Sequence, residues 1–267
     1  MNAYEWDAED YSQHSDVQKR WAGELIERLT LTGNEAVLDL GCGDGWGAAQ
    51  MAGTLPNGSV LGVDYSPAMI ALARRRYPPD RHPNLRFQVM DARALSFEAC
   101  FDRVFSNAVL HWVDDHRPVL SGLYRRLKPD GKLLLRMGGQ GDVAEIRATM
   151  DKVTMSAQWS EYFQGFEFPY TFPGVDEYRA MLKAEGFSVN RLELIATDMA
   201  HEGRAGLAGW IRTTWLPYTQ RIPENLRESF IETVCSDYLD QVPLSADGKA
   251  HVAMVLLKVE ANKSDKT

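Results

Sequence analysis

The chain has little cysteine, no long apolar run and no excess of positive charge. Its three cysteines, Cys42, Cys100 and Cys235, are spread over 267 residues, so neither a disulfide framework nor a C-x-x-C metal site is indicated. A membrane-spanning helix needs roughly 20 apolar residues in succession, and the sequence has no such run. The first residues show no basic segment followed by an apolar core, as an export signal would. We therefore expect a cytoplasmic protein.

The charge balance also limits the partners. A net charge of -8 and a pI near 5.3 argue against a surface for nucleic acid or anionic membrane. The histidines other than His111 lack metal-ligand spacing, so no metal is expected. A small-molecule substrate is the expected partner, and the chain is a monomer or a homodimer. With 45% hydrophobic residues it can form one α/β domain with a modest insertion.

Short β-like runs alternate with helical segments, which is the pattern of an α/β fold with a largely parallel, doubly wound sheet. A helix is predicted after Ser66, since Ser66 can cap it, Pro67 suits its first turn and arginines 74–76 suit its C-terminus. Another is predicted over Leu120–Leu127, followed by a turn at 128–131. The expected strands are Ala36–Leu40, Ser59–Val63, Leu85–Val89, Arg103–Ser106, Lys132–Met137, Val189–Ile195 and Val252–Val259.

Two regions lie outside this alternation. Residues 1–29 are predicted to form an N-terminal cap helix region, because Val17, Trp21, Leu25 and Ile26 share one helical face. The main domain then spans 30–261, and the polar residues 262–267 are expected to be a disordered tail.

Helical insertions are expected at about 138–173 and 204–242. Ligands of open α/β sheets bind outside the carboxyl ends of the strands, so these insertions can form a lid over the substrate. A helical pair that simply covers one sheet edge is the alternative.

The most informative stretch is 37–45 followed by 60–64, which predicts a strand, a glycine turn, a helix and a second strand with an acidic tip. Gly41 and Gly43 can take positive φ and let backbone N–H groups approach a ligand. Asp64 stands where a carboxylate accepts the hydroxyls of a ribose. A glycine turn with a purely structural role remains the alternative.

An acid, Asp39, stands just before the glycine turn. It would repel a pyrophosphate but suits a ligand with an ammonium and a sulfonium. The motif at 39–45, Asp-Leu-Gly-Cys-Gly-Asp-Gly, resembles the first motif of the class I S-adenosylmethionine (SAM) methyltransferases. The resemblance implies a Rossmann-like, seven-stranded methyltransferase sheet with SAM as cofactor. It implies cofactor contacts from Asp39, Gly41, Gly43, Asp64, Tyr65, Asp91 (to the adenine amino group), Ala92 and Asn107 (beside the methionine part).

The segment 106–116, Ser-Asn-Ala-Val-Leu-His-Trp-Val-Asp-Asp-His, resembles the trans-aconitate methyltransferases and relatives that methylate other carboxylates, including those of juvenile hormone acid and malonyl-acyl-carrier protein. Near the N-terminus, Tyr11 and Gln18 resemble the Tyr…Gln helix of that group. The resemblance implies O-methylation of the carboxylate of a small acid, with Gln18, His111 and Trp112 as catalytic residues.

Residues 207–217 are similar to the substrate-lid helix of the same group, which implies substrate contacts from Tyr11, Gln18, Trp112, Trp210 and Tyr218. The trans-aconitate enzymes carry an arginine before the lid proline, whereas this chain has Leu216. Arg212, four residues earlier, shares a helix face with that position and can replace it as a substrate contact. The many aromatic residues favour a partly apolar acid over a tricarboxylate.

The chemistry asks little of the protein, because a carboxylate is already a nucleophile at neutral pH and needs only orientation and exclusion of water. Gln18 and Trp112 are expected to donate hydrogen bonds to it. His111 either packs beside the site or acts as a base, which a nitrogen or carbon acceptor would require. C- or N-methylation of a small metabolite and a protein that has lost catalysis therefore stay as alternatives.

Overall fold

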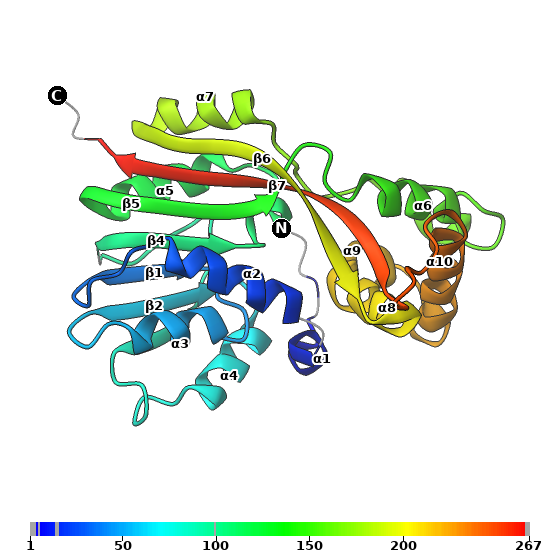
Figure 1. Cartoon of the computed structure of the whole chain (residues 1–267), viewed down its shortest axis with the longest axis horizontal. Helices are drawn as coiled ribbons and strands as arrows, with labels where there is room; N and C mark the ends of the chain where they lie inside the picture. The colour runs from blue at the N-terminus through cyan, green and yellow to red at the C-terminus, as the bar shows by residue number, and fades with distance from the viewer. Residues whose placement is uncertain (1–3, 5, 14–15, 99, 265–267) are drawn as a thin grey trace.

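The computed structural model describes residues 4, 6–13, 16–98 and 100–264, and the side chains of 11–18 are outside that description. In the described part, seven strands form one mixed sheet in the order β3-β2-β1-β4-β5-β7-β6 (Figure 1). β1 to β5 run parallel, and β7 lies antiparallel between β5 and β6. The strands are β1 Ala36–Leu40, β2 Ser59–Asp64, β3 Leu85–Val89, β4 Phe101–Asn107, β5 Leu127–Gly138, β6 Phe187–His201 and β7 Ala250–Lys263.

Helices pack on both faces of the sheet. One face is covered by α2, α3 and α4, which bury Leu25, Met51 and Ile70 in a shared core. The other is covered by α5 and α7, which bury Leu123 and Leu182. The helices are α1 Ala8–Gln13, α2 Asp16–Glu27, α3 Trp46–Gly53, α4 Pro67–Arg76, α5 Arg117–Arg126, α6 Ala144–Thr154, α7 Val175–Glu185, α8 Gly203–Thr214, α9 Leu216–Thr219 and α10 Arg227–Gln241, with the 3₁₀ turns η1 Leu110–Trp112, η2 Ser160–Phe163 and η3 Glu224–Leu226.

The last two strands leave the sheet as a two-stranded ribbon. β5 pairs with β7 as far as Gly138, opposite Leu256, whereas β6 and β7 stay paired until His201 lies opposite Ala250. The helices α6, α8, α9 and α10 gather around the far end of this ribbon (Figure 1). We call these helices, the residues 155–163 that follow α6, and the ribbon end the lid. Its own buried core includes Trp159, Trp215, Tyr218, Phe230 and Tyr238.

The short helix α1 lies between the main sheet and the lid, in contact with α4 and α8. Glu9 pairs with Arg75 of α4 at 2.8 Å, and Asp10 pairs with Arg212 of α8 at 3.6 Å. A segment near the N-terminus therefore joins the two parts of the molecule.

All seven expected strands are present, although β6 and β7 run well beyond their expected ends. The predicted helix after Ser66 is α4, and Ser66 Oγ accepts the expected capping bond from the Met69 N–H, at 3.3 Å. The turn predicted at 128–131 is present within β5: Leu127 pairs with Phe101 and Lys132 with Arg103, so residues 128–131 have no partner on β4. An irregularity in this pairing and a positive φ of 60° at Asp130 place the bend inside the strand.

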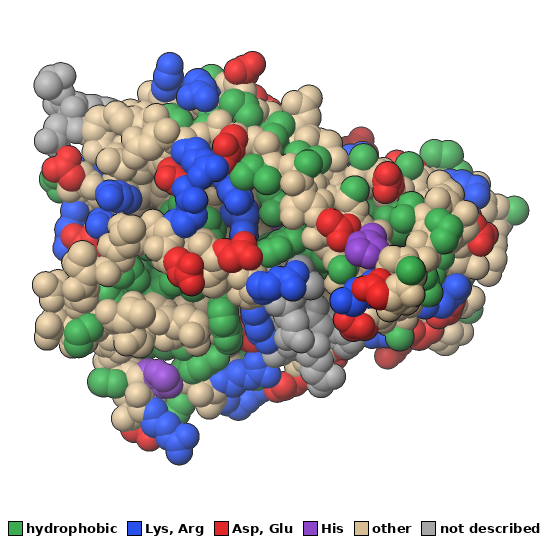
Figure 2. All heavy atoms as spheres, in the orientation of Figure 1, with side chains coloured by type: hydrophobic (Ala, Val, Ile, Leu, Met, Phe, Trp, Pro, Cys, Tyr) green, Lys and Arg blue, Asp and Glu red, His purple; other side chains and the backbone are tan. Residues whose placement is uncertain are grey.

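On the face shown in Figure 2, acidic and basic side chains are interspersed. Ion pairs also join different elements of the chain, such as Arg76 with Asp44 at 2.7 Å and Arg204 with Glu232 at 2.9 Å. Within the described ranges, no helix is long and apolar enough to cross a membrane.

Candidate active site

Three cavities meet at the carboxyl ends of the central strands. The first, here the Asp64 cavity, is lined by residues that include Gly41, Gly43, Asp64, Tyr65, Ala92 and Trp112. The second, the Asp39 cavity, is lined by residues that include Lys19, Asp39, Gly41, Gly43 and Asp44. The third, the aromatic cavity, is lined by residues that include Trp6, Trp21, His111, Trp112, Arg136, Asp142, Tyr170, Trp210 and Trp215. Asn107, the last residue of β4, lines all three.

The glycine turn after β1 separates the Asp64 cavity from the Asp39 cavity. Gly41 and Gly43 have φ of 76° and 53°, in the left-handed region that favours glycine. A Cβ on Gly41 would lie 2.2 Å from the Val109 side chain, whereas a Cβ on Gly43 would meet no atom within 4 Å. Gly43 therefore borders open cavity space, and a ligand can approach its backbone closely.

Asp64, at the end of β2, ties this turn to the sheet. Its Oδ2 accepts a hydrogen bond from the Gly43 N–H at 3.0 Å, and its Oδ1 accepts one from the Ser66 N–H at 2.8 Å. Burial raises the pKa of this carboxyl, and the two bonds act in the opposite direction. A carboxylate has about four acceptor sites, so Asp64 retains capacity for hydroxyl groups in the cavity.

Asp39 is a buried carboxyl that faces the second cavity. Burial, together with the nearby Asp64, raises its pKa to about 8. An ionised carboxylate in such a place is costly without a cation beside it. The Asp39 cavity consequently suits a ligand with a positive charge.

Rings surround most of the third cavity. Trp112, in η1, lies 5.0 Å from Trp6 and 4.5 Å from Tyr170 between ring centroids. Trp6 and Trp112 line both the aromatic cavity and the Asp64 cavity. The two cavities are therefore adjacent, and a group can pass between their contents beside Trp112.

His111 lines the aromatic cavity and is uncharged. Burial, with a smaller effect from His116, lowers its pKa to about 3. Its Nδ1 accepts a hydrogen bond from the Gly138 N–H at 3.3 Å. Since Nδ1 is an acceptor, the proton of the neutral ring is on Nε2, and His111 can donate a hydrogen bond but is poorly suited to take a proton.

Two charged residues of this cavity were not singled out from the sequence. Arg136 of β5 donates from Nε to Asn107 Oδ1 at 2.9 Å, and its guanidinium lies 5.6 Å from the Trp21 ring centre. Asp142 accepts from the Val255 N–H at 2.7 Å, and burial raises its pKa to about 7. Arg136 could have been identified from the sequence, because it is a charged residue within the otherwise apolar strand Leu133-Leu-Leu-Arg-Met137.

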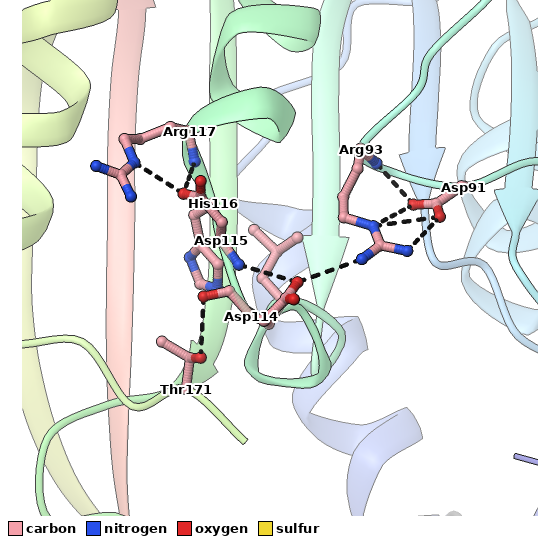
Figure 3. Close-up of polar contacts among 8 residues, drawn as sticks. Asp91, Arg93, Asp114, Asp115, His116, Arg117 and Thr171 are labelled. Carbon is pink, nitrogen blue, oxygen red and sulfur yellow. Dashed lines mark hydrogen bonds and ion pairs between the residues drawn. The ribbon is translucent and has the colours of Figure 1, made fainter. Parts of the chain in front are cut away.

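Two expected cofactor and substrate residues point elsewhere. The Asp91 carboxylate is bound by the Arg93 side chain, with a shortest distance of 2.8 Å, and Arg93 continues to Asp114 at 3.3 Å (Figure 3). These bonds lower the pKa of Asp91, which does not line the Asp64 cavity, although its neighbours Met90 and Ala92 do. Tyr218 is buried in the lid core and donates to Asp151 at 3.3 Å.

Arg212 also differs from the expectation. Its guanidinium pairs with Glu228 of α10 at 3.0 Å and with Asp10 at 3.6 Å, so these acids hold it away from the aromatic cavity. Trp210, from the same helix, does line the cavity. The expected side chains Tyr11 and Gln18 lie outside the described residues.

Known methyltransferases are similar to this chain in sequence. A family model described as a methyltransferase domain matches residues 38–135. Trans-aconitate 2-methyltransferase of Methylobacterium nodulans is 30% identical over 249 residues, which cover 92% of this chain and 93% of that protein. The Variovorax paradoxus protein of the same name is 28% identical, with 97% and 98% covered.

Solved structures give the same fold. A structure from Bacillus halodurans, of a protein named as a putative methyltransferase, superimposes with a TM-score of 0.63 at 17% identity, over 91% of this chain and 99% of that chain. Phosphoethanolamine N-methyltransferase 2 of Haemonchus contortus, solved in complex with SAM, gives a TM-score of 0.61 at 23% identity, over 97% of this chain and 57% of that chain. At these identities the likeness concerns the fold alone.

Proposed function

Because the chain belongs to the class I SAM-dependent methyltransferases, in the group of the trans-aconitate 2-methyltransferases, we propose that it O-methylates the carboxylate of a small, partly apolar acid. The enzyme class and the cofactor follow from the family. The carboxylate as acceptor and the role of each residue are the proposed part.

The residues of the first two cavities fit SAM. Asp39 is a buried carboxyl with a raised pKa, which an ammonium group would stabilise in its charged form. Gly43 leaves open space beside its backbone, and Asp64 can accept the ribose hydroxyls. We assign Tyr65, Ala92 and Asn107 to the same ligand, since they line these cavities. SAM supplies an activated methyl group when it is bound.

The observation that carries the proposal is the wall shared by the Asp64 cavity and the aromatic cavity. Asn107, Ala108 and Trp112 line both, so an acceptor in the aromatic cavity lies next to the expected position of the methyl group. The rings around it exclude water and favour an acceptor with an apolar part.

The polar groups at this wall suit an acceptor that needs no base. A carboxylate is ionised at neutral pH, and the protein has only to hold it. The Nε2–H of His111 and the indole N–H of Trp112 are neutral donors for this purpose, and they orient a carboxylate without the strong ion pair that would lower its nucleophilicity. Gln18 stays a proposed third donor from the N-terminal helix.

Asp142 keeps a second function open, namely C- or N-methylation. Its carboxyl lines the aromatic cavity, and with a pKa of about 7 it could take a proton from a nitrogen or carbon acceptor near neutral pH. An enzyme of this kind would depend strongly on Asp142, whereas a carboxylate methyltransferase would not.

A labelled-methyl assay separates the two functions. The purified protein is incubated with methyl-labelled SAM and a panel of acids, amines and phenols, and the labelled product is then treated with mild alkali. Label released as methanol identifies an ester and supports the proposal, whereas alkali-stable label on an amine nitrogen or on a carbon atom supports the second function. Asp142→Asn serves as the paired variant, since it should retain most ester formation but abolish N- or C-methylation.

A further inference from the structure

Asp142 is an acid that has no cation beside it in the aromatic cavity. The residue is only 5% exposed, and among the described residues that line this cavity it is the only aspartate or glutamate. Its carboxyl forms no ion pair with any residue that the structure describes, and burial is the main cause of its raised pKa. A buried carboxylate is costly without a partner of opposite charge. A cation from a ligand would remove this cost.

The two oxygens of Asp142 have different surroundings. Oδ1 accepts a hydrogen bond from the Val255 N–H at 2.7 Å, which fixes the carboxyl on β7. Oδ2 lies over Gly138, where a Cβ would collide with it and would also meet the Phe172 ring. Gly138 and Phe172 line the aromatic cavity too. Oδ2 therefore faces the space that a side chain at Gly138 would occupy, and a ligand group can reach it there.

The other walls of the cavity also suit an organic cation. Faces of tryptophan, tyrosine and phenylalanine rings attract ammonium groups, and such rings form most of the lining. Arg136 is the only lysine or arginine among the described lining residues. Neither Arg136 nor Asp142 acts on the pKa of the other, so Arg136 does not strongly repel a cation that is bound at Asp142.

We propose that Asp142 binds an ammonium group of the acceptor, so that the acceptor carries an amine in addition to the carboxylate that is methylated. This inference rests on the proposed function. Asp142 does not line the Asp64 cavity, so the amine is held away from the wall at which the methyl group is transferred. The acceptor is then an amino acid with an apolar part.

The contact should appear in the binding of the acceptor and not in the chemical step. The ammonium keeps its charge during methyl transfer to the carboxylate, so Asp142 binds it equally well before and during the reaction. Such uniform binding lowers KM and leaves kcat unchanged. Ester formation by Asp142→Asn should therefore be retained at saturating acceptor, while the KM for an amino acid acceptor rises.

The test compares probes with and without an amine. The reference probe is 3-phenylpropionate, which has one carboxylate and a phenyl ring. Three probes add an amine at different distances from the carboxylate, namely phenylalanine, 3-amino-3-phenylpropionate and 3-(4-aminomethylphenyl)propionate. Phenyllactate carries a hydroxyl in place of the amine of phenylalanine. Chiral probes are used as racemates, and calorimetry measures the binding of each probe to the full chain saturated with S-adenosylhomocysteine.

The variants remove the charge of Asp142 and keep the cavity small. Asp142→Asn has nearly the same shape and can still accept the hydrogen bond from Val255. Asp142→Ser is the second variant, and it decides the outcome if Asp142→Asn does not fold. Asp115→Asn is the matched control, since it removes a surface carboxylate that is paired with Arg117.

We expect the unmodified protein and Asp115→Asn to bind at least one amine probe about tenfold or more tightly than 3-phenylpropionate, because the amine adds a charge-assisted hydrogen bond. Phenyllactate should gain no more than about threefold. In the Asp142 variants the preference for the amine should fall to within about threefold. SAM affinity should stay within about twofold in all variants, since Asp142 lines neither the Asp64 cavity nor the Asp39 cavity.

Three results would overturn the inference. They are no preference of the unmodified protein for any amine probe, including no binding of any probe, an equal preference for phenyllactate, and a preference that survives in a folded Asp142 variant. Failure of the proposed function has a different signature in the labelled-methyl assay. Alkali-stable label on an amine nitrogen with an Asp142-dependent preference contradicts carboxylate methylation alone, whereas alkali-labile label with no preference contradicts the Asp142 inference alone.

Discussion

The Nδ1 atom of His111 accepts a hydrogen bond from the backbone N–H of Gly138, which makes this buried histidine a neutral donor through Nε2. Its pKa of about 3 lies well below that of an unfolded histidine, about 6.5. The unfolded chain thus binds a proton that the folded chain rejects. Stability is fully present above pH 6.5 and is lost as the pH falls from there toward 3.

We therefore expect His111→Gln to reduce the acid sensitivity of the fold. Between pH 6.5 and 5 the free energy of unfolding should fall less steeply in the variant, by up to about 1.4 kcal/mol per pH unit. Urea unfolding at several pH values measures this slope. Parallel slopes for the two proteins would mean that His111 is not held neutral in the folded state.

The Asp39 carboxyl predicts a pH dependence of SAM binding. The pKa of Asp39 is about 8 when no cation lies beside it, so the carboxyl is largely protonated below that pH. Binding of an ammonium group should then make Asp39 release its proton. SAM affinity should thus rise between pH 6 and 7.5, by up to about tenfold per unit. Asp39→Asn should bind SAM weakly and without this rise. Calorimetry in buffers of different ionisation enthalpy counts the released proton, and no release would place the ammonium elsewhere.

Asp64→Ala should weaken SAM binding more than tenfold, since two hydroxyl bonds to a carboxylate are worth roughly 2–3 kcal/mol. Loss of the Gly43 and Ser66 bonds adds to this effect by loosening the turn. Asp115→Ala, which removes a surface carboxylate bound to Arg117, is the control. Unchanged affinity in the Asp64 variant would remove this residue from the cofactor site.

The two glycines of the turn should respond differently to a side chain. Gly43→Val places its Cβ in open space, so we expect a folded protein, with a backbone strain of about 1–2 kcal/mol, that has lost SAM binding. Gly41→Val drives its Cβ into Val109 and should instead lower the melting temperature markedly. Thermal unfolding with and without SAM checks both. A Gly43 variant that SAM still stabilises normally would contradict the assignment of the turn.

Trp112→Phe keeps a ring at the shared wall but removes the indole N–H. With a carboxylic acid as acceptor, kcat/KM should fall about tenfold, as expected for a lost neutral donor, while SAM affinity changes little. Trp159→Phe is a suitable control for the loss of an indole, because Trp159 is buried in the lid core. Equal turnover in the Trp112 variant and the unmodified protein would exclude the indole as a donor.

The sequence predicts the parts of the site that local chemistry determines. Gly41, Gly43 and Asp64 line the cavities because a glycine turn and a strand end fix their positions with few long-range contacts. The position of the Arg212 side chain could not be predicted in the same way. It depends on ion pairs with Glu228 and Asp10, which belong to other helices. Asp91 could have been reassigned from sequence, because Arg93 is only two residues away.

Arg136 was missed for a related reason. Alternation along β5 does not tell which strand face meets a cavity, and that depends on α2, whose Trp21 packs near the guanidinium. The length of the ribbon was also not predicted. Beyond the sheet, β6 and β7 are stabilised by pairing with each other, and the sequence of either segment alone does not indicate this pairing.

The ribbon has a mechanical consequence for the enzyme. β6 and β7 stay paired where they pass from the sheet into the lid. The lid is therefore connected to the sheet by a stiff two-stranded ribbon and not by a flexible loop. Separating it from the sheet would require bending that strand pair and stretching its hydrogen bonds. Trp6 forms another side of the aromatic cavity and lies just before the short helix α1. The contacts of α1 with α4 and α8 include exposed ion pairs, which contribute little to stability. This side of the cavity can therefore open at a lower cost in free energy. We therefore expect the acceptor to pass on the N-terminal side, and the lid to act as a fixed wall.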